Sequence, residues 1–197
     1  MKLIDSELTW SATNEDNARI ATEAIANRIG SAETFRSKFN ATPSSPIYLV
    51  MGKQDVGDIN ISEFCENNND DGGCTTGKRI INFNSLSRWN DGCTAQHNIV
   101  HEFGHIYNNV NNGTPASKMA DLSINPEDFV TNRKEIIKPN VDCSWVLNDA
   151  MTPQETFGDF FVAWTYDQWQ EPLVDNYQNL TRSGKARQWM NNFMGTP

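Results

Sequence analysis

The stretch HNIVHEFGHIYNN (residues 97–109) contains all three histidines of this chain of 197 residues. Within it, HEFGH matches the pattern HExxH. His101 and His105 are four positions apart, so on a helix both imidazoles lie on one face, one turn from each other. Two imidazoles so placed can bind one metal ion, and Glu102 lies near enough to take a proton from water at that metal. The stretch therefore predicts a metal site on a helix.

The third histidine, His97, does not belong to that site. It lies eight residues before His105, which is about 12 Å along a helix axis. A zinc ion with bonds of about 2 Å cannot bridge such a distance. We therefore expect His97 to be a hydrogen-bonded or surface histidine with no catalytic role.

The motif helix is predicted over 94–110, with Thr94 as its N-cap and the residues 111–113 (NNG) ending it. Gly104 has no side chain, so we expect another element to approach the helix closely at this point. Apolar side chains cover much of the remaining surface, which predicts a buried back: Ile99, Val100, Phe103, Ile106 and Val110.

A catalytic zinc ion takes three protein ligands and a water in tetrahedral geometry. No further histidine exists in the sequence, so we expect a carboxylate as the third ligand. The segment 152–169 is predicted to be a helix with Pro153 at its first position, and it carries Glu155 and Asp159 one turn apart on an apolar background. We expect Glu155 to bind the metal and Asp159 to accept the second N–H of His101.

Other interpretations of these acids stay open. Thr152 and Glu155 also fit a capping box, in which Glu155 only closes the N-terminus of the helix. Asp121, Asp142 and Asp149 are alternative third ligands.

HExxH followed by a helix with ExxxD resembles the gluzincin metallopeptidases, of which thermolysin is the familiar example. The run PQETFGDFF (153–161) is also similar to the glutamate helix of the anthrax lethal-factor-like branch. The resemblance lies in two short motifs between residues 95 and 169. It implies a zincin-like domain with a small sheet, an active-site helix and a glutamate helix, and it implies that the strand expected over 79–84 binds substrate backbone as an edge strand.

By the same resemblance the zinc ligands would be His101, His105 and Glu155, the general base would be Glu102, and Asp159 would support a ligand. The metzincin family is excluded because Asn108 and Asn111 stand where its glycine and third histidine belong.

The chain departs from the gluzincin pattern in two ways. The gap of 49 residues between His105 and Glu155 is longer than in thermolysin. The donor that stabilises the transition state cannot be assigned from a motif, although Tyr166 and Tyr177 are possible.

Composition narrows the function classes. The formal charge is −9, and the sequence pI is about 4.7, which argues against nucleic acid and anionic membranes as partners because both need clustered Lys and Arg. No apolar run approaches the roughly 18 residues that a membrane span requires. A peptide or protein substrate and a monomeric state are expected instead.

The four cysteines have no CxxC spacing, which favours two disulfides over a zinc ribbon. We expect Cys65 to pair with Cys74 across a polar loop, and Cys93 to pair with Cys143, although two other pairings are open. Disulfides indicate an oxidising compartment, so a secreted protein with its leader removed is expected.

The periodicity along the chain predicts a single α+β domain over residues 1–197. Strands are expected over 46–52 and 79–84, and further helices over 15–29, 126–138 and 183–194. The function expected from this chain is zinc-dependent endopeptidase activity. A non-catalytic binding module that keeps zinc for its fold is the alternative, and a non-peptidase hydrolase is a third option.

Overall fold

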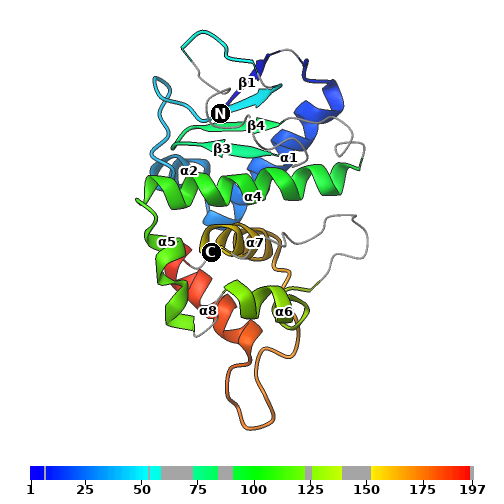
Figure 1. Cartoon of the computed structure of the whole chain (residues 1–197), viewed down its shortest axis with the longest axis vertical. Coiled ribbons are helices and arrows are strands. Elements are labelled where there is room, and N and C mark those ends of the chain that lie inside the picture. Colours follow the sequence, from blue (N-terminus) through cyan, green and yellow to red (C-terminus); the bar gives the residue numbers. More distant parts are fainter. Residues whose placement is uncertain are drawn as a thin grey trace.

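The structure is a computed structural model that describes residues 1–6, 8–52, 54–58, 73–83, 91–122, 126–138 and 152–195. It confirms an α+β arrangement, in which a small sheet lies on one side of a stack of helices (Figure 1). The strands are β1 (Lys2–Asp5), β2 (Tyr48–Met51), β3 (Cys74–Thr76) and β4 (Ile80–Phe83). The helices are α1 (Ala12–Ile29), α2 (Ala32–Lys38), α4 (Gly92–Val110), α5 (Thr114–Ser117), the 3-10 helix η2 (Lys118–Leu122), α6 (Pro126–Ile136), α7 (Pro153–Tyr166) and α8 (Arg182–Met194).

The described strands form one four-stranded sheet in the order β1-β2-β4-β3. Strands β1, β2 and β4 run parallel to one another, and β3 runs antiparallel to β4 with Thr75 opposite Ile81. The strand expected over 79–84 is therefore confirmed as β4, but its expected place at the sheet edge is wrong. That edge belongs to β3, which was not predicted because it is short and begins at the last residue of the polar loop expected over 65–74.

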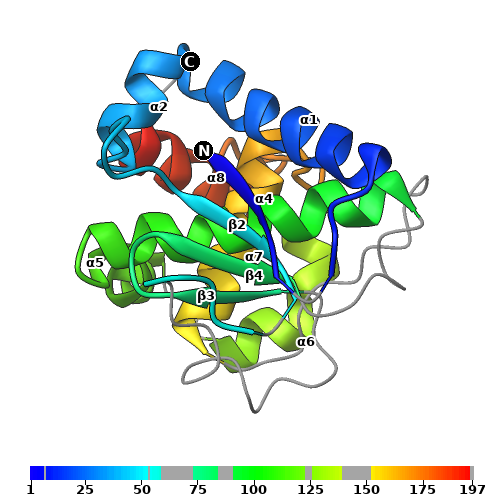
Figure 2. The ribbon, with the colours of Figure 1, turned by 90° about the horizontal axis from the view of Figure 1, so that it is seen from above.

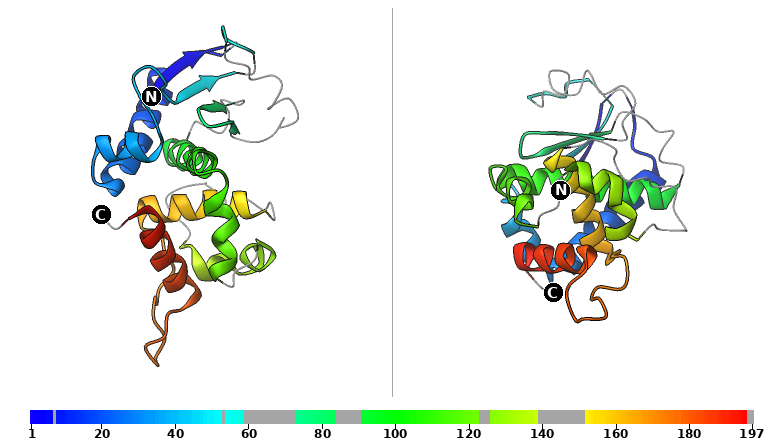
Figure 3. Two further views of the ribbon diagram at one scale, coloured as in Figure 1. Left: turned by 90° about the vertical axis from the view of Figure 1, so that its left-hand side faces the viewer. Right: turned by 60° about the horizontal axis from the view of Figure 1, so that its bottom comes forward.

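Helix α4 packs beneath the sheet and contacts α1 on one side and α7 on the other. Seen from above, α4 runs behind the sheet and α1 lies beside it (Figure 2). Two further views place α6 and α8 beyond α7, away from the sheet (Figure 3). Aromatic rings fill the interface between these layers: Phe39 meets Phe103, Tyr107 and Phe161 edge to face at 5.6 to 6.2 Å between ring centroids. The metal motif thus lies on the central layer of the molecule.

All five predicted helices are confirmed, with one or both ends shifted. Helix α1 ends at Gly30, as expected, because that residue adopts the left-handed conformation with φ 108°. Helix α7 begins after Thr152 with Pro153 in its first turn, and it ends at Tyr166 rather than at 169 because Asp167 turns left-handed. Strand β1 and helix α2 were not predicted, since both are too short to show a period.

The expected N-cap of α4 is wrong. Asp91 takes that place, because its Oδ1 accepts a hydrogen bond from the backbone N–H of Cys93 at 3.0 Å. Thr94 instead donates its hydroxyl to the other carboxylate oxygen of Asp91 at 2.9 Å. The helix therefore starts two residues earlier than its apolar pattern suggested.

Cys74 and Cys93 are both disulfide-bonded. Their expected partners, Cys65 and Cys143, lie outside the described residues, so both pairings stay predictions. Within the described segments, no helix combines the length and the apolar character needed to cross a membrane.

The role of Asp91 as N-cap of α4 can be tested by its effect on stability. We expect Asp91→Ala to lower the free energy of unfolding by about 1 kcal/mol, because the first turn of α4 loses its acceptor. Asp91→Asn keeps an oxygen acceptor and should lose clearly less. Urea denaturation followed by circular dichroism measures both, and a larger loss in Thr94→Ala than in Asp91→Ala would contradict this assignment.

Candidate metal centre

The candidate site lies where α4 and α7 cross at a glycine contact. A Cβ atom added to Gly104 would lie 3.0 Å from the Cα of Gly158 and 3.0 Å from the Cβ of Phe161. The two backbones therefore approach more closely than side chains would allow, as expected for Gly104. This contact brings the first turns of α7 against the histidine face of α4.

Two imidazole nitrogens and one carboxylate meet at this crossing. The Nε2 atoms of His101 and His105 are 3.1 Å apart, and the carboxylate of Glu155 lies 3.1 Å from the first and 3.4 Å from the second. Ligand atoms around a tetrahedral zinc ion with bonds of about 2.0 Å are about 3.3 Å from one another. The spacing of these atoms, and their identity as two imidazoles and a carboxylate, therefore fit one zinc ion.

Asp159 supports this group from behind. Its Oδ1 lies 3.0 Å from Nδ1 of His101, and its side chain is buried. When Nδ1 donates its proton to Asp159, the lone pair of Nε2 faces Glu155 and His105, which is the tautomer that binds a metal. The contact expected between Asp159 and His101 is thus present.

The charges of the site depend on these contacts. Burial alone would lower the pKa of His101, but its hydrogen bonds to Asp159 and Glu155 raise that pKa well above the usual value. Burial would raise the pKa of Glu155, yet hydrogen bonds with His101 and His105 hold it well below its usual range. Glu155 is therefore a carboxylate at neutral pH, the form that binds a cation.

Glu102 also belongs to the group, in a different position. Its ligand atom and those of His101 and His105 all lie within 4.8 Å of one another, and these three residues form a group that can hold a metal ion. The carboxylate of Glu155 lies 3.1 Å and 3.4 Å from the two imidazoles, whereas the Oε2 atom of Glu102 accepts a hydrogen bond from Thr75 at 2.6 Å. Glu155 thus contacts both histidines directly, and Glu102 is tied to the sheet.

The structure also bears on the other interpretations: a capping role for Glu155, and Asp121, Asp142 or Asp149 as the third ligand. Thr152 does cap α7, and its hydroxyl accepts from the backbone N–H of Glu155 at 3.2 Å. The backbone of Glu155 thus serves the cap while its carboxylate reaches the histidines. Among the other acids, Asp142 and Asp149 lie outside the described residues, as does the side chain of Asp121.

His97 is a buried structural histidine, as its distance from His105 predicted. Its Nδ1 lies 2.9 Å from the carbonyl oxygen of Cys93, its Nε2 lies 3.2 Å from Oε1 of Gln168, and its ring stacks on Tyr166 at 4.5 Å. Burial lowers its pKa below the usual value, and its hydrogen bonds to Cys93 and Gln168 act in the opposite direction. The residue therefore helps to hold α4 against the end of α7.

Neither tyrosine considered from the sequence is placed to stabilise a transition state. Tyr166 lies eleven residues after Glu155 on one continuous helix, about 16 Å along its axis, and its hydroxyl is buried. Tyr177 is 85% exposed in the segment 170–181, at the opposite end of the molecule from the sheet (Figure 1).

Sequence reasoning missed two residues that shape the site. A Cβ atom on Gly158 would lie 2.6 to 2.8 Å from ring atoms of His101, so only glycine leaves room for that imidazole. The sequence feature that could have indicated this role is the position of Gly158 in the helical turn between Glu155 and Asp159. Thr75 was missed because its contact with Glu102 depends on how β3 folds back along β4.

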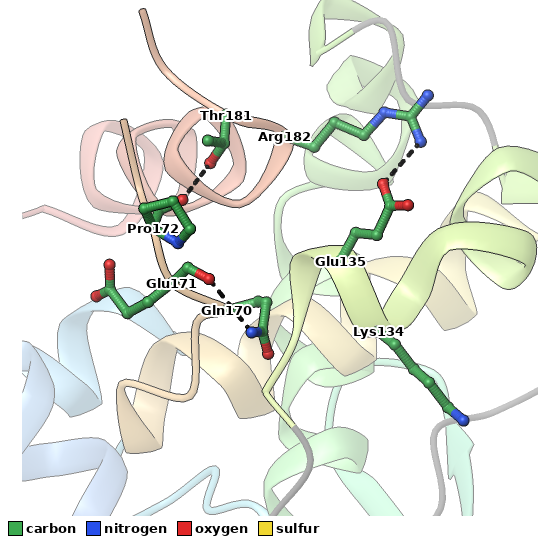
Figure 4. Close-up of a pocket in the computed structure, with 7 residues that line it drawn as sticks. All are labelled: Lys134, Glu135, Gln170, Glu171, Pro172, Thr181 and Arg182. Carbon is green, nitrogen blue, oxygen red and sulfur yellow. Dashed lines mark hydrogen bonds and ion pairs between the residues drawn. The ribbon is translucent and has the colours of Figure 1, made fainter. Parts of the chain in front are cut away.

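A pocket of about 450 Å³ lies elsewhere, between α6 and the segment that leads into α8 (Figure 4). Its walls are partly joined to each other, by an ion pair between Arg182 and Glu135 at 3.4 Å and by a hydrogen bond from Thr181 to the carbonyl of Pro172 at 2.9 Å. None of the histidines or acids of the candidate metal centre lines it: its lining is Lys134, Glu135, Gln170, Glu171, Pro172, Thr181 and Arg182.

His97 and His105, at two different places on α4, allow a matched test of metal binding. We expect wild type to hold one zinc ion per chain, His105→Gln to lose it, and His97→Gln to keep it, because only His105 provides a donor at the crossing. Elemental analysis after loading and gel filtration measures the ratio. Equal loss of zinc from both variants would contradict the assignment.

No family model, no curated protein and no solved structure matches this chain. The geometry alone establishes a coarse result, that His101, Glu102 and His105 form a group able to hold a metal ion.

Proposed function

We propose that this chain is a zinc-dependent endopeptidase of gluzincin type. The observation that carries the proposal is the meeting of His101, His105 and Glu155: the two Nε2 atoms are 3.1 Å apart, Oε2 of Glu155 lies 3.1 Å from that of His101, and Oε1 lies 3.4 Å from that of His105. The carboxylate of Glu102 belongs to the same group as the two histidines and accepts a hydrogen bond from Thr75. The resemblance of the two sequence motifs to gluzincins agrees with this arrangement.

The arrangement of elements supports a zincin-like domain. A small sheet lies over α4, its antiparallel strand β3 contacts α4, and α7 with its two acids crosses on the other side. These are the parts that the motif resemblance implied. Substrate backbone would add to the outer edge of β3 rather than to β4, because β4 already has a partner on each side.

In the proposed mechanism, each side chain has one task. His101, His105 and Glu155 would hold zinc, which supplies Lewis-acid polarisation of a peptide carbonyl and a lower pKa for the attacking water. Glu102 takes a proton from that water and returns it to the leaving amine. Asp159 keeps His101 in its metal-binding tautomer through the hydrogen bond to Nδ1.

The side chains of the site differ in their exposure to solvent. The side chain of His101 is only 9% exposed, whereas that of Glu155 is 27% exposed and that of His105 is 13% exposed. Asp159 is buried behind His101. A peptide would therefore approach over Glu155 and His105, while the hydrogen bond that orients His101 stays away from water.

A second candidate is a binding module that keeps zinc for its fold without catalysis. The observation in its favour is that, among the residues that the structure describes, Tyr166 and Tyr177 both lie away from the centre. This candidate predicts bound zinc, no cleavage of any peptide library, and unfolding on chelation.

The disulfide bonds of Cys74 and Cys93 support a proposed extracellular location. The proposed substrates are peptides or proteins, and the proposed oligomeric state is a monomer.

The central test separates the two glutamates. We expect Glu102→Gln to keep zinc and to lower kcat/KM by about 100-fold or more, because the amide cannot accept the proton. Glu155→Ala should lose both zinc and activity. Glu135→Gln, which changes an exposed glutamate on α6, is the matched control and should match wild type. Full peptidase activity in zinc-loaded Glu102→Gln would refute the proposal.

A further inference from the structure

The sheet edge nearest to α4 carries a hydroxyl directed at the proposed general base. Thr75 is the middle residue of β3 and pairs with Ile81, which is fully buried in the main core. Paired residues on neighbouring strands share a face of the sheet, so Thr75 faces α4. Cys74 lies on the opposite face and packs with Val50 in a separate cluster.

The hydroxyl of Thr75 has one proton and two acceptors within reach, both on Glu102. Its Oγ1 lies 2.6 Å from the carboxylate oxygen Oε2 and 3.2 Å from the backbone carbonyl oxygen of Glu102. A separation near 2.6 Å is typical of a hydroxyl donating to a charged carboxylate. The hydroxyl of Thr75 therefore donates its hydrogen bond to Oε2 of Glu102.

Gly73 leaves room for the carboxylate of Glu102 because it has no side chain. A Cβ atom on Gly73 would lie 2.9 Å from Cγ and 3.0 Å from Oε1 of Glu102, so the chain just before β3 leaves room for the acid. Thr75 is β-branched, and such side chains have few rotamers on a strand, which keeps the hydroxyl aimed at α4. Glu102 is held between the two residues.

The hydrogen bond from Thr75 matters because the carboxylate of Glu102 is close enough to His101 and His105 to become a metal ligand itself. Its ligand atom lies within 4.8 Å of those of His101 and His105, and a glutamate released from the strand has enough rotatable bonds to reach the same ion. A carboxylate bound directly to the metal no longer accepts a proton from water.

We propose that Thr75 is the positioning residue of Glu102: its hydroxyl holds the carboxylate off the metal and in place to accept a proton. The inference rests on the proposed function in two respects: a metal ion at this site and the role of Glu102 as general base. In this arrangement the sheet edge next to the substrate also sets the position of the base.

The test uses the full chain with three substitutions. Thr75→Val keeps the shape and removes the hydroxyl, Thr75→Ser keeps the hydroxyl, and Thr76→Val makes the same change on the opposite face of β3. Thr75→Ala is a second hydroxyl-free variant in case the valine form does not fold. Each variant is loaded with Co²⁺, whose visible spectrum at one fixed pH reports the ligand set, and with Zn²⁺ for peptide cleavage.

We expect the hydroxyl-free variants to bind one metal ion, to show a changed cobalt spectrum, and to lose about tenfold or more in kcat while KM changes by less than about twofold. Thr75→Ser should recover the wild-type spectrum and most of kcat, and Thr76→Val should resemble wild type. A wild-type spectrum and kcat in Thr75→Val would overturn the inference. So would a serine variant as impaired as the valine variant, because packing alone would then explain the effect.

The two proposals can fail separately. If wild type binds metal but cleaves no peptide, the proposed function fails and the cobalt spectra alone decide the role of Thr75. A spectrum that changes in Thr75→Val and returns in Thr75→Ser supports the positioning role, and an unchanged spectrum overturns it. A wild type that takes up no metal overturns both proposals.

Discussion

The close contact of α4 with α7 is the constraint on which the rest of the site depends. Helix axes separated by ordinary side chains lie about 8 to 10 Å apart, and a glycine on each side at the contact allows a nearer approach. At this crossing Gly104 meets Gly158, and the ring of His101 occupies the space that a side chain at 158 would fill. Both acids of α7 consequently reach one imidazole, Glu155 at Nε2 and Asp159 at Nδ1. Burying an imidazole and a carboxylate is costly unless their polar atoms are paired, and here each ring nitrogen of His101 has a carboxylate partner.

Helical periodicity accounts for what could be predicted from the sequence. His101 and His105 had to share a face once 94–110 was recognised as a helix, and the same period placed Glu155 and Asp159 together. The proximity of the two helices followed only from the chemistry of a third ligand, yet the structure brings all four side chains together. Helix existence was easier to predict than helix ends, because an apolar pattern fixes a face but says little about its first residue.

Features that depend on contacts between distant segments could not be predicted. Asp91 and Thr94 are both good cap residues, and only the backbone geometry decides between them. Strand β3 was hidden behind a polar stretch, so the sheet edge and the contact of Thr75 with Glu102 were missed with it. Tyr166 was considered for catalysis because a sequence does not show that its ring stacks on His97, about three turns of α7 away from Glu155.

The place of Glu155 in the first turn of α7 has a consequence for the unfolded chain. The first turn is where helix backbone N–H groups lack partners and where a helix opens most easily. An ion held by His105 and Glu155 would tie that turn to the end of α4 and close a loop of 49 residues. Closing a loop removes conformational entropy from the unfolded ensemble, and the loss grows only slowly with loop length. The ion would thus act on this chain as a reversible cross-link, whose strength chelators and zinc concentration set.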